Sequence, residues 1–254
     1  MTIGIVIPAR LDSERLPRKV LKDFLGMPMI EHVWRRAQLT NPLLETVIAT
    51  DSIEIKKTVE KFGAICILTS KNHNNGLSRV GEIDNQLQWD YYLILQADEI
   101  LIEPESLNLL AKITLSNSKY EFFNLITKLE KVEEISDINI VKCLMRDDNS
   151  IISMARKSNS IAREFEQMKY TSKICGVYSC SNHLLKELVS MTAQKIERSE
   201  SIEQMRVIEK GHSILGVPIE RSFPSVNTSN EAMLALSILQ TDGTQKSILN
   251  SYIR

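Results

Sequence analysis

The first hundred or so residues alternate between short apolar runs and amphipathic segments, and this alternation limits the possible folds. The expected strands are rich in Val, Ile and Leu and cover residues 3–9, 46–50, 64–68 and 91–98. The expected helices place apolar residues at helical spacing and cover residues 27–39, 51–63 and 103–115. Strands that alternate with helices predict an α/β fold, in which a mostly parallel sheet of buried strands is covered by helices.

The pattern changes after about residue 118, where several expected strands follow one another without intervening helices. They cover residues 121–129, 140–145, 150–156, 171–180 and 213–220. The stretch RDDNS at 146–150 is a turn signal and predicts a hairpin between two of them. Further helices are expected at residues 182–191, 201–211 and 229–239. Since no linker or repeat interrupts the chain, the sequence predicts one domain, 1–254, with an antiparallel element inserted in its second half.

Composition excludes several classes of protein. The 254 residues carry 31 basic and 32 acidic side chains, a balance that gives no indication of a nucleic-acid or membrane partner. No apolar run approaches the roughly 20 residues that a membrane span needs. The four cysteines form no CxxC pair, and the four histidines lie far apart in the chain. We therefore expect a cytoplasmic protein with reduced cysteines and no zinc.

Three polar stretches follow predicted strands, at the sheet edge where open α/β proteins bind ligands. Residues 8–21 bring four cations, residues 69–79 form a pliable loop with Gly76 and the cation Arg79, and residues 96–100 bring two acids. Cations, a pliable loop and a carboxylate at one edge predict a nucleoside triphosphate with a divalent metal. The side chains concerned are Arg10, Arg15, Lys19, Arg79, Asp98 and Glu99, with Gly76 in the loop.

Simpler interpretations stand beside this one. Taken singly, Arg15 and Lys19 are typical of solvated loop charges, and Asp98 is typical of a helix N-cap before residues 103–115. The chain contains no GxxxxGK[ST], GxGxxG or GxSxG motif, which excludes the P-loop, the dinucleotide fingerprint and the nucleophile elbow. A phosphate group is therefore expected to bind side chains and the loop after the first strand.

The stretch PARLDSERLPRKVL at 8–21 resembles the N-terminal signature PAR-x-x-S-x-R-L-P-x-K-x-L of the 3-deoxy-manno-octulosonate cytidylyltransferase (CMP-Kdo synthetase) family. The resemblance continues to about residue 236. The further stretches that carry it are GMPMIEHVWRRA (26–37), VIATD (47–51), NNGLSR (74–79), LQADEI (95–100), NIVKC (139–143) and SIEQMRVIEKGHSI (201–214).

This resemblance implies a Rossmann-like nucleotide-diphospho-sugar transferase fold and the transfer of CMP from CTP to an acidic 3-deoxy-sugar, with release of pyrophosphate, for bacterial surface polysaccharide. It also implies Mg²⁺ as cofactor and a homodimer, which the apolar inserted strands favour as well. Residues 1–118 would bind the nucleotide, and residues 119–240 would bind the acceptor sugar and form the dimer.

The resemblance also assigns residues to roles. The expected catalytic residues are Arg10, Arg15, Lys19 and Asp98. The expected nucleotide-binding residues are Pro8, Ala9, Arg10, Ser13, Arg15, Lys19, Gly76, Arg79 and Gln96. The expected acceptor-binding residues are Gln96, Lys142, Arg156, Glu203 and Gln204, and the expected metal ligands are Asp98 and Asn227.

Three of the chain's departures from the family bear on the metal and on the sugar. Asn227, in VNTSNEA, stands where the family has a metal-binding Asp, so that Glu99 or Glu231 remains an alternative ligand. Ile174 stands where the family has a sugar-pocket His, and ARKSNSI at 155–161 keeps an arginine but lacks the family's proline. The nucleotide end is thus retained and the sugar end altered. This leaves open a related acidic or amino sugar, another base with a sugar phosphate, or a non-catalytic nucleotide-binding paralogue.

Overall fold

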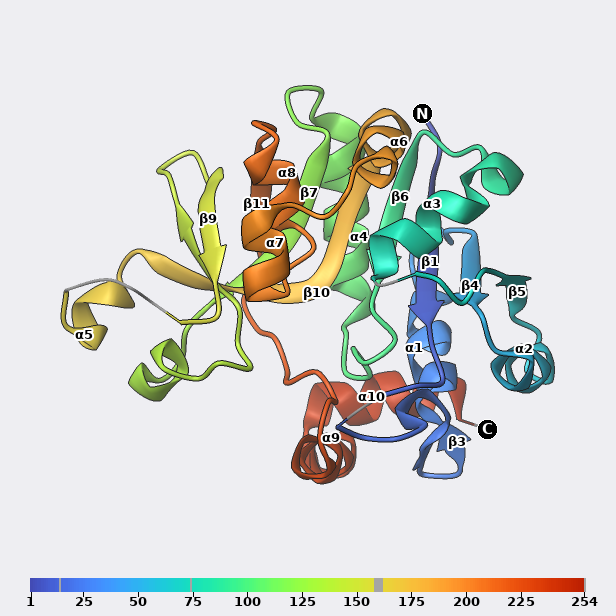
Figure 1. Ribbon diagram of the computed structural model, residues 1–254. Helices are drawn as coiled ribbons and strands as arrows, with labels where there is room; N and C mark the ends of the chain where they lie inside the picture. The colour runs from blue at the N-terminus through green and yellow to red at the C-terminus, as the bar shows by residue number, and fades with distance from the viewer. Residues whose placement is uncertain (14, 74, 158–161, 254) are drawn as a thin grey trace.

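A computed structural model describes residues 1–13, 15–73, 75–157 and 162–253. Within these residues nine strands form one sheet, whose main path runs β11-β7-β10-β6-β1-β4-β5 (Figure 1). The strands are β1 (Ile3–Ala9), β4 (Thr46–Thr50), β5 (Ile65–Leu68), β6 (Tyr91–Leu95), β7 (Phe122–Lys128), β8 (Lys142–Met145), β9 (Ile151–Ala155), β10 (Thr171–Ser181) and β11 (Ile214–Pro218). A separate two-stranded ribbon pairs β2 (Asp23–Phe24) with β3 (Met27–Pro28).

The strand directions confirm the expected sheet, which is mostly parallel and contains an antiparallel element. β1 pairs in parallel with β4 and β6, β4 with β5, and β7 with β11. β10 is antiparallel to both β6 and β7, and the hairpin β8–β9 extends the sheet by pairing on the first residues of β10. The predicted α/β fold with an inserted antiparallel element is therefore confirmed.

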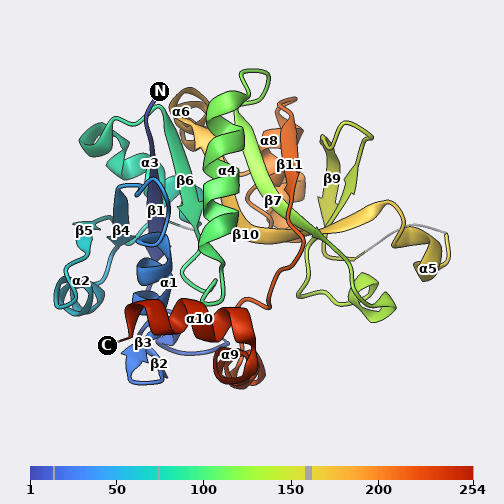
Figure 2. The same cartoon turned by 180° about the vertical axis from the view of Figure 1, so that it is seen from behind.

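Helices cover both faces of the sheet, with α3, α6, α7 and α8 in front in Figure 1 and α1 and α4 in front in the reverse view of Figure 2. They are α1 (Met29–Ala37), α2 (Ile53–Glu60), α3 (Gly76–Leu87), α4 (Pro104–Ser116), α5 (Glu164–Gln167), α6 (Asn182–Ser190), α7 (Lys195–Glu200), α8 (Met205–Glu209), α9 (Ser229–Thr241) and α10 (Gly243–Tyr252), with 3₁₀ turns η1 (Lys19–Leu21) and η2 (Val132–Ile135). Ile5 and Ile7 belong to one apolar core cluster and Val6 to the other, because successive side chains of a strand point to opposite faces.

Helix α3 corrects the expectation of a pliable loop at residues 69–79. Asn75 caps this helix, and its side-chain oxygen accepts a hydrogen bond from the Ser78 amide at 2.9 Å. Leu77, Val80 and Ile83 are buried at a spacing of three residues, which is the signal that predicts a helix here.

Strand β5 corrects a second expectation, since it was expected to be buried. It lies at the sheet edge with β4 as its only neighbour in the strand order, and Ile65 and Leu68 are 55% and 40% exposed. Helices α7 and α10 were not expected, and the helix expected at 201–211 covers only Met205–Glu209. All four cysteines are free thiols, and three of them are buried. In the part of the chain described, no helix is long and apolar enough to cross a membrane.

Helices α7 and α8 are joined by a buried ion pair between Glu197 and Arg206, whose side chains are each 6% exposed. Two guanidinium nitrogens of Arg206 donate to the carboxylate at 2.8 and 2.6 Å, and a third donates to the Leu188 carbonyl at 2.8 Å. A charge-assisted pair with this many hydrogen bonds joins α7 and α8 to each other and to α6.

We predict that Glu197→Gln lowers the free energy of unfolding by about 3–5 kcal/mol, because it leaves the Arg206 charge buried without its counter-ion. Urea denaturation measures this loss. As a control, Lys169→Met removes an ion pair with Glu166 whose partners are more than half exposed, and it should cost under about 1 kcal/mol. Equal stabilities for the two variants would contradict this role of the buried pair.

Candidate active site

The site is built around the ammonium group of Lys19, at the start of η1. Its Nζ lies 2.7 Å from Asp98 Oδ2 and 3.0 Å from Asn227 Oδ1. Asp98 follows β6, and Asn227 lies between β11 and α9, so that three distant segments meet at one point. Lys19, which is expected to bind the triphosphate, thus contacts both of the residues that are expected to bind the metal.

The sheet explains this convergence. β1 and β6 are parallel neighbours, so the loops that follow them leave the same edge. The Val226 amide donates to the Asp98 carbonyl at 3.0 Å and so holds the segment before α9 against the loop after β6. Asp98 is not a helix N-cap, since Glu103 has that position in α4.

Asp98 and Asn227 together offer one carboxylate and one amide oxygen to a cation. Among the described residues, no three His, Cys, Asp or Glu side chains are grouped as a metal site. Mg²⁺ is commonly held by one or two carboxylates together with substrate phosphates rather than by a cage of protein ligands. The Asp98 and Asn227 oxygens already converge on an ammonium ion. They therefore fit a metal whose remaining ligands would come from a bound triphosphate.

Neither alternative carboxylate gains support as a metal ligand. Glu99 Oε1 accepts hydrogen bonds from the Gly176 amide at 3.0 Å and the Ser225 hydroxyl at 2.6 Å. Burial, together with the neighbouring Asp98 charge, raises the pKa of Glu99 to about 7. Glu231 Oε2 accepts from the Asn227 amide at 2.8 Å within the capping box of α9. Both carboxylates hold backbone segments.

Two further cations of the first loop face outward. Arg10 and Arg15 are exposed, and Arg15 Nη1 donates to Asn139 Oδ1 at 3.0 Å across the sheet edge. Ser13 is half-buried beside them in the chain. The pKa of Arg156 is lowered first by burial and next by the positive charge of Arg15. Two guanidinium groups that repel each other favour an anion between them.

The expected nucleotide-binding residues Pro8, Gly76 and Gln96 lie in contact. A Cβ atom on Gly76 would lie 3.1 Å from Gln96 Nε2 and 3.2 Å from Pro8 Cγ, so a side chain here would displace its neighbours. Ala9 is buried at the end of β1 beside Pro8. This close approach gives the first residue of α3 a reason to be glycine.

Glu203 links this group to β10. Its Oε1 accepts from Gln96 Nε2 at 3.2 Å and from the Tyr178 hydroxyl at 2.6 Å, and its Oε2 accepts from the Leu77 amide at 3.1 Å. Burial raises the pKa of Glu203. Sequence reasoning gave Tyr178 no role, although it lies in the stretch ICGVY that carries Ile174.

Arg79 lies inside α3 rather than in a loop, and it is buried. Its guanidinium donates to Asp51 Oδ2 at 3.1 Å and to the Thr69 hydroxyl. Asp51 and Thr69 directly follow β4 and β5. Arg79 therefore ties the carboxyl ends of these two strands to α3.

Lys142 and Gln204, expected to bind the acceptor, make internal contacts. The Lys142 ammonium donates to the backbone carbonyls of Asp137 at 2.6 Å, Ile140 at 2.8 Å and Arg156. These bonds use all three of its protons. Gln204 Nε2 is buried and donates to Asn124 Oδ1 at 3.3 Å.

Arg156 also binds backbone. Its guanidinium donates to the carbonyls of Glu200 at 2.8 Å, Ile138 at 3.2 Å and Ser201 at 3.2 Å. Ile174 is half-buried and packs against the apolar cluster on the α3 face. The family's SRxxIP proline position falls in 158–161, which lies outside the described residues. Of the expected acceptor residues, Gln96 and Glu203 therefore lie nearest the nucleotide edge.

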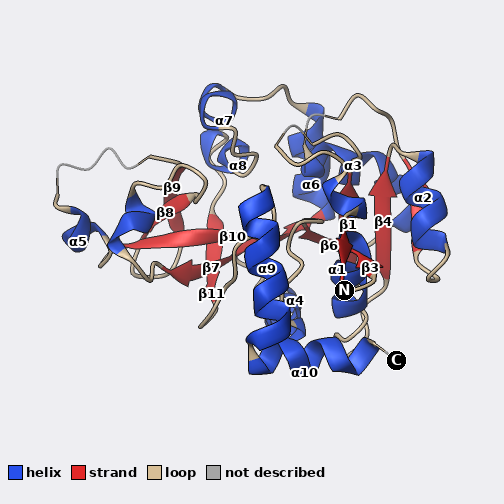
Figure 3. Ribbon diagram, turned by 90° about the horizontal axis from the view of Figure 1, so that it is seen from below, coloured by secondary structure: helices blue, strands red, loops and turns tan. Residues whose placement is uncertain are grey.

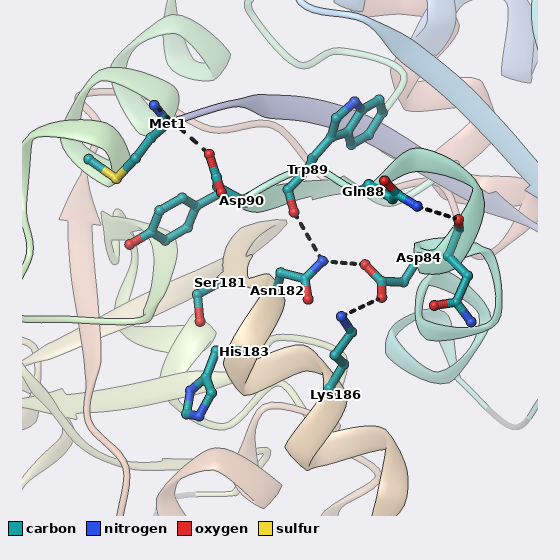
Figure 4. Close-up of a pocket in the computed structure, with 11 residues that line it drawn as sticks. Met1, Asp84, Gln88, Trp89, Asp90, Ser181, Asn182, His183 and Lys186 are labelled. Carbon is teal, nitrogen blue, oxygen red and sulfur yellow. Dashed lines mark hydrogen bonds and ion pairs between the residues drawn. The ribbon is translucent and has the colours of Figure 1, made fainter.

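A hollow of about 610 Å³ lies at the opposite end of the sheet, between the start of β6 and α6 (Figure 4). Its polar groups pair with one another: the Asp84 carboxylate accepts from Asn182 and lies 3.2 Å from the Lys186 ammonium. Asn182 also donates to the Trp89 carbonyl at 3.0 Å. These contacts tie α3, β6 and α6 together, and the hollow brings together none of the residues expected to bind nucleotide.

Comparison with known proteins shows the family of this chain. Residues 4–214 match the family model described as cytidylyltransferase. The 3-deoxy-manno-octulosonate cytidylyltransferase of Chlorobium limicola is 34% identical over 242 residues, 94% of this chain and 98% of the relative. The enzyme of the same name from Fusobacterium nucleatum is 36% identical over 224 residues, 88% of this chain and 91% of the relative.

Solved structures give the same result. The structure of CMP:2-keto-3-deoxy-manno-octonic acid synthetase complexed with CTP matches with a TM-score of 0.89 and 27% identity, covering 95% of this chain and 100% of that one. The inositol-1-phosphate CTP transferase of T. maritima shares the fold, with a TM-score of 0.68, 12% identity, and coverage of 96% and 97%. The chain therefore belongs to the 3-deoxy-manno-octulosonate cytidylyltransferase family, as its first motif predicted.

Proposed function

We propose that this protein transfers CMP from CTP to an acidic 3-deoxy-sugar related to Kdo, with release of pyrophosphate. The observation that carries the proposal is the contact of the Lys19 ammonium with a carboxylate oxygen of Asp98 and an amide oxygen of Asn227, because these are the groups that would bind phosphate and a divalent metal. Support for CTP and for Kdo comes from the relatives, whose names specify the sugar and one of whose structures holds CTP.

In this reaction the sugar hydroxyl attacks the α-phosphorus, and the bond from that phosphorus to the bridging oxygen of pyrophosphate breaks. Arg10, Arg15 and Lys19 bind the triphosphate and stabilise the negative charge that grows on the departing pyrophosphate. Asp98 and Asn227 would hold Mg²⁺, which supplies further positive charge at the phosphoryl oxygens. The contribution of the protein is mainly positioning and electrostatics.

The two ends of the site have separate tasks under this proposal. Residues 1–118 bind the nucleotide, with Pro8, Gly76 and Gln96 around the nucleoside, and residues 119–240 bind the acceptor. Because Ile174 cannot donate a hydrogen bond, we infer an acceptor that differs from Kdo in one substituent. We infer that the protein works in the cytoplasm, where CTP is made, and that its product supplies bacterial surface polysaccharide.

The direct test measures pyrophosphate release from CTP and Mg²⁺ with Kdo and with acidic or amino variants of Kdo. We expect release with CTP and one such variant, and less with Kdo. Ile174→His should raise turnover of Kdo about tenfold, because sites built on a hydrogen bond discriminate strongly. Lys19→Ala should lower turnover about a hundredfold or more.

Arg18→Ala is the matched control, because Arg18 lies in the same loop but pairs with Glu54. The turnover of this variant should equal that of the wild type. Release only with another nucleotide and a sugar phosphate would replace this proposal by the second enzyme class. CTP binding without release from any sugar would indicate a non-catalytic paralogue.

We also propose a homodimer formed through the lobe of β8, β9 and α5, which projects from the body in Figure 3. Large apolar side chains are exposed on this lobe and the loop before it: Ile138, Leu144, Ile152 and Phe165. Exposed apolar side chains gathered in one region are typical of protein interfaces.

Sedimentation should then give twice the chain mass of 28.9 kDa. Phe165→Glu, at a side chain 65% exposed, should shift the protein towards monomer, because it would bury a charge in the interface. Met233→Glu, at a side chain 64% exposed on α9, is the control and should remain dimeric. A monomeric wild type would overturn this part of the proposal.

A further inference from the structure

The carboxylate of Glu99 joins three segments directly behind the site. Its Oε1 accepts from the Gly176 amide in β10 at 3.0 Å and from the Ser225 hydroxyl at 2.6 Å. Glu99 itself is buried and follows Asp98 in the chain, while Ser225 lies two residues before Asn227. One oxygen atom therefore connects both segments that carry the oxygens around Lys19.

Backbone hydrogen bonds run beside this carboxylate. The Gln96 amide donates to the Gly176 carbonyl and the Val226 amide donates to the Asp98 carbonyl, each at 3.0 Å. The register of β10 against β7 is irregular between Ile174 and Tyr178, and a bulge of this kind turns backbone groups out of the ladder. The Gly176 amide is thereby available to a side chain.

A side chain at position 176 would displace the Glu99 carboxylate. A Cβ atom at this position would lie 2.4 Å from Glu99 Oε1, closer than any ordinary contact. Because the carboxylate is pressed against the strand backbone, its position is fixed on one side by β10 and on the other by Ser225. Both of these hydrogen-bond partners of Glu99 Oε1 therefore lie outside the contact of Lys19 with Asp98 and Asn227.

We propose that Glu99 is a positioning residue that sets the separation of Asp98 and Asn227 through its bonds to Gly176 and Ser225, without being a ligand itself. This inference rests on the proposed function, because it takes Asp98 and Asn227 as the metal ligands. Residues that orient metal ligands from outside typically change metal affinity ten- to a hundredfold when they are removed.

The test measures how tightly Mn²⁺ binds to the protein together with CTP, from the enhancement of water-proton relaxation, and compares it with the KM for CTP at saturating Mg²⁺. Ser225→Ala and Glu99→Ala should each weaken Mn²⁺ binding about tenfold or more, with the KM for CTP changed less than about threefold. Glu99→Gln keeps an oxygen acceptor towards Gly176 and Ser225, and it should bind Mn²⁺ within about threefold of the wild type.

Ser222→Ala is the matched control, since Ser222 lies in the same segment beside Cys175 but, among the described residues, makes no hydrogen bond to Glu99, and its Mn²⁺ affinity should not change. Wild-type affinity in Ser225→Ala would overturn the inference. A loss in Glu99→Gln as large as in Glu99→Ala would also overturn it, because the negative charge of a direct ligand would then be required. If the wild type with CTP binds no Mn²⁺, the proposed metal site fails as well, so the two failures are distinguishable.

Discussion

The contact of the Lys19 ammonium with Asp98 and Asn227 is the interaction on which the site depends. The three residues come from positions 19, 98 and 227, so their meeting requires the parallel pairing of β1 and β6 and the return of the chain after β11. Two oxygen acceptors around one half-buried ammonium also keep its charge paired in a partly desolvated place. Under the proposed function, the same arrangement would supply a cation for phosphate and oxygens for a metal.

The other polar side chains of the family motifs stabilise the fold around this site. Hydrogen bonds of Arg79 join the ends of β4 and β5 to α3, and hydrogen bonds of Glu203 join α3 to Gln96 and β10. Arg206 holds α8 on α7, and Lys142 gathers three backbone carbonyls. Each is a buried or half-buried polar group with its partners supplied by the fold, because an unpaired buried group would cost about 1–3 kcal/mol. These contacts allow the loops at the sheet edge to keep a fixed geometry.

The sequence predicts the strands of the sheet well where a run is apolar and β-branched, as at Ile3–Ala9 and Tyr91–Leu95. Helix α3 was missed because Asn75 and Gly76 resemble a loop, although the first is an N-cap. The exposure of β5 follows from strand order, which no local pattern encodes. The internal roles of Lys142, Arg79 and Gln204 depend on contacts across the fold, so residue type and position could not distinguish them from ligand-binding side chains.

The central claim is that Asp98 and Asn227 form one cation-binding position, which the Lys19 ammonium occupies. Mn²⁺ titration of the nucleotide-free protein tests this claim most directly. Lys19→Met should bind Mn²⁺ about five- to tenfold more tightly than the wild type, because the ammonium no longer competes for the two oxygens; this ratio corresponds to an ion pair of about 1 kcal/mol. Asn227→Asp should also bind more tightly, since a hard cation prefers an anionic oxygen. An affinity in Lys19→Met equal to or weaker than that of the wild type would contradict the claim.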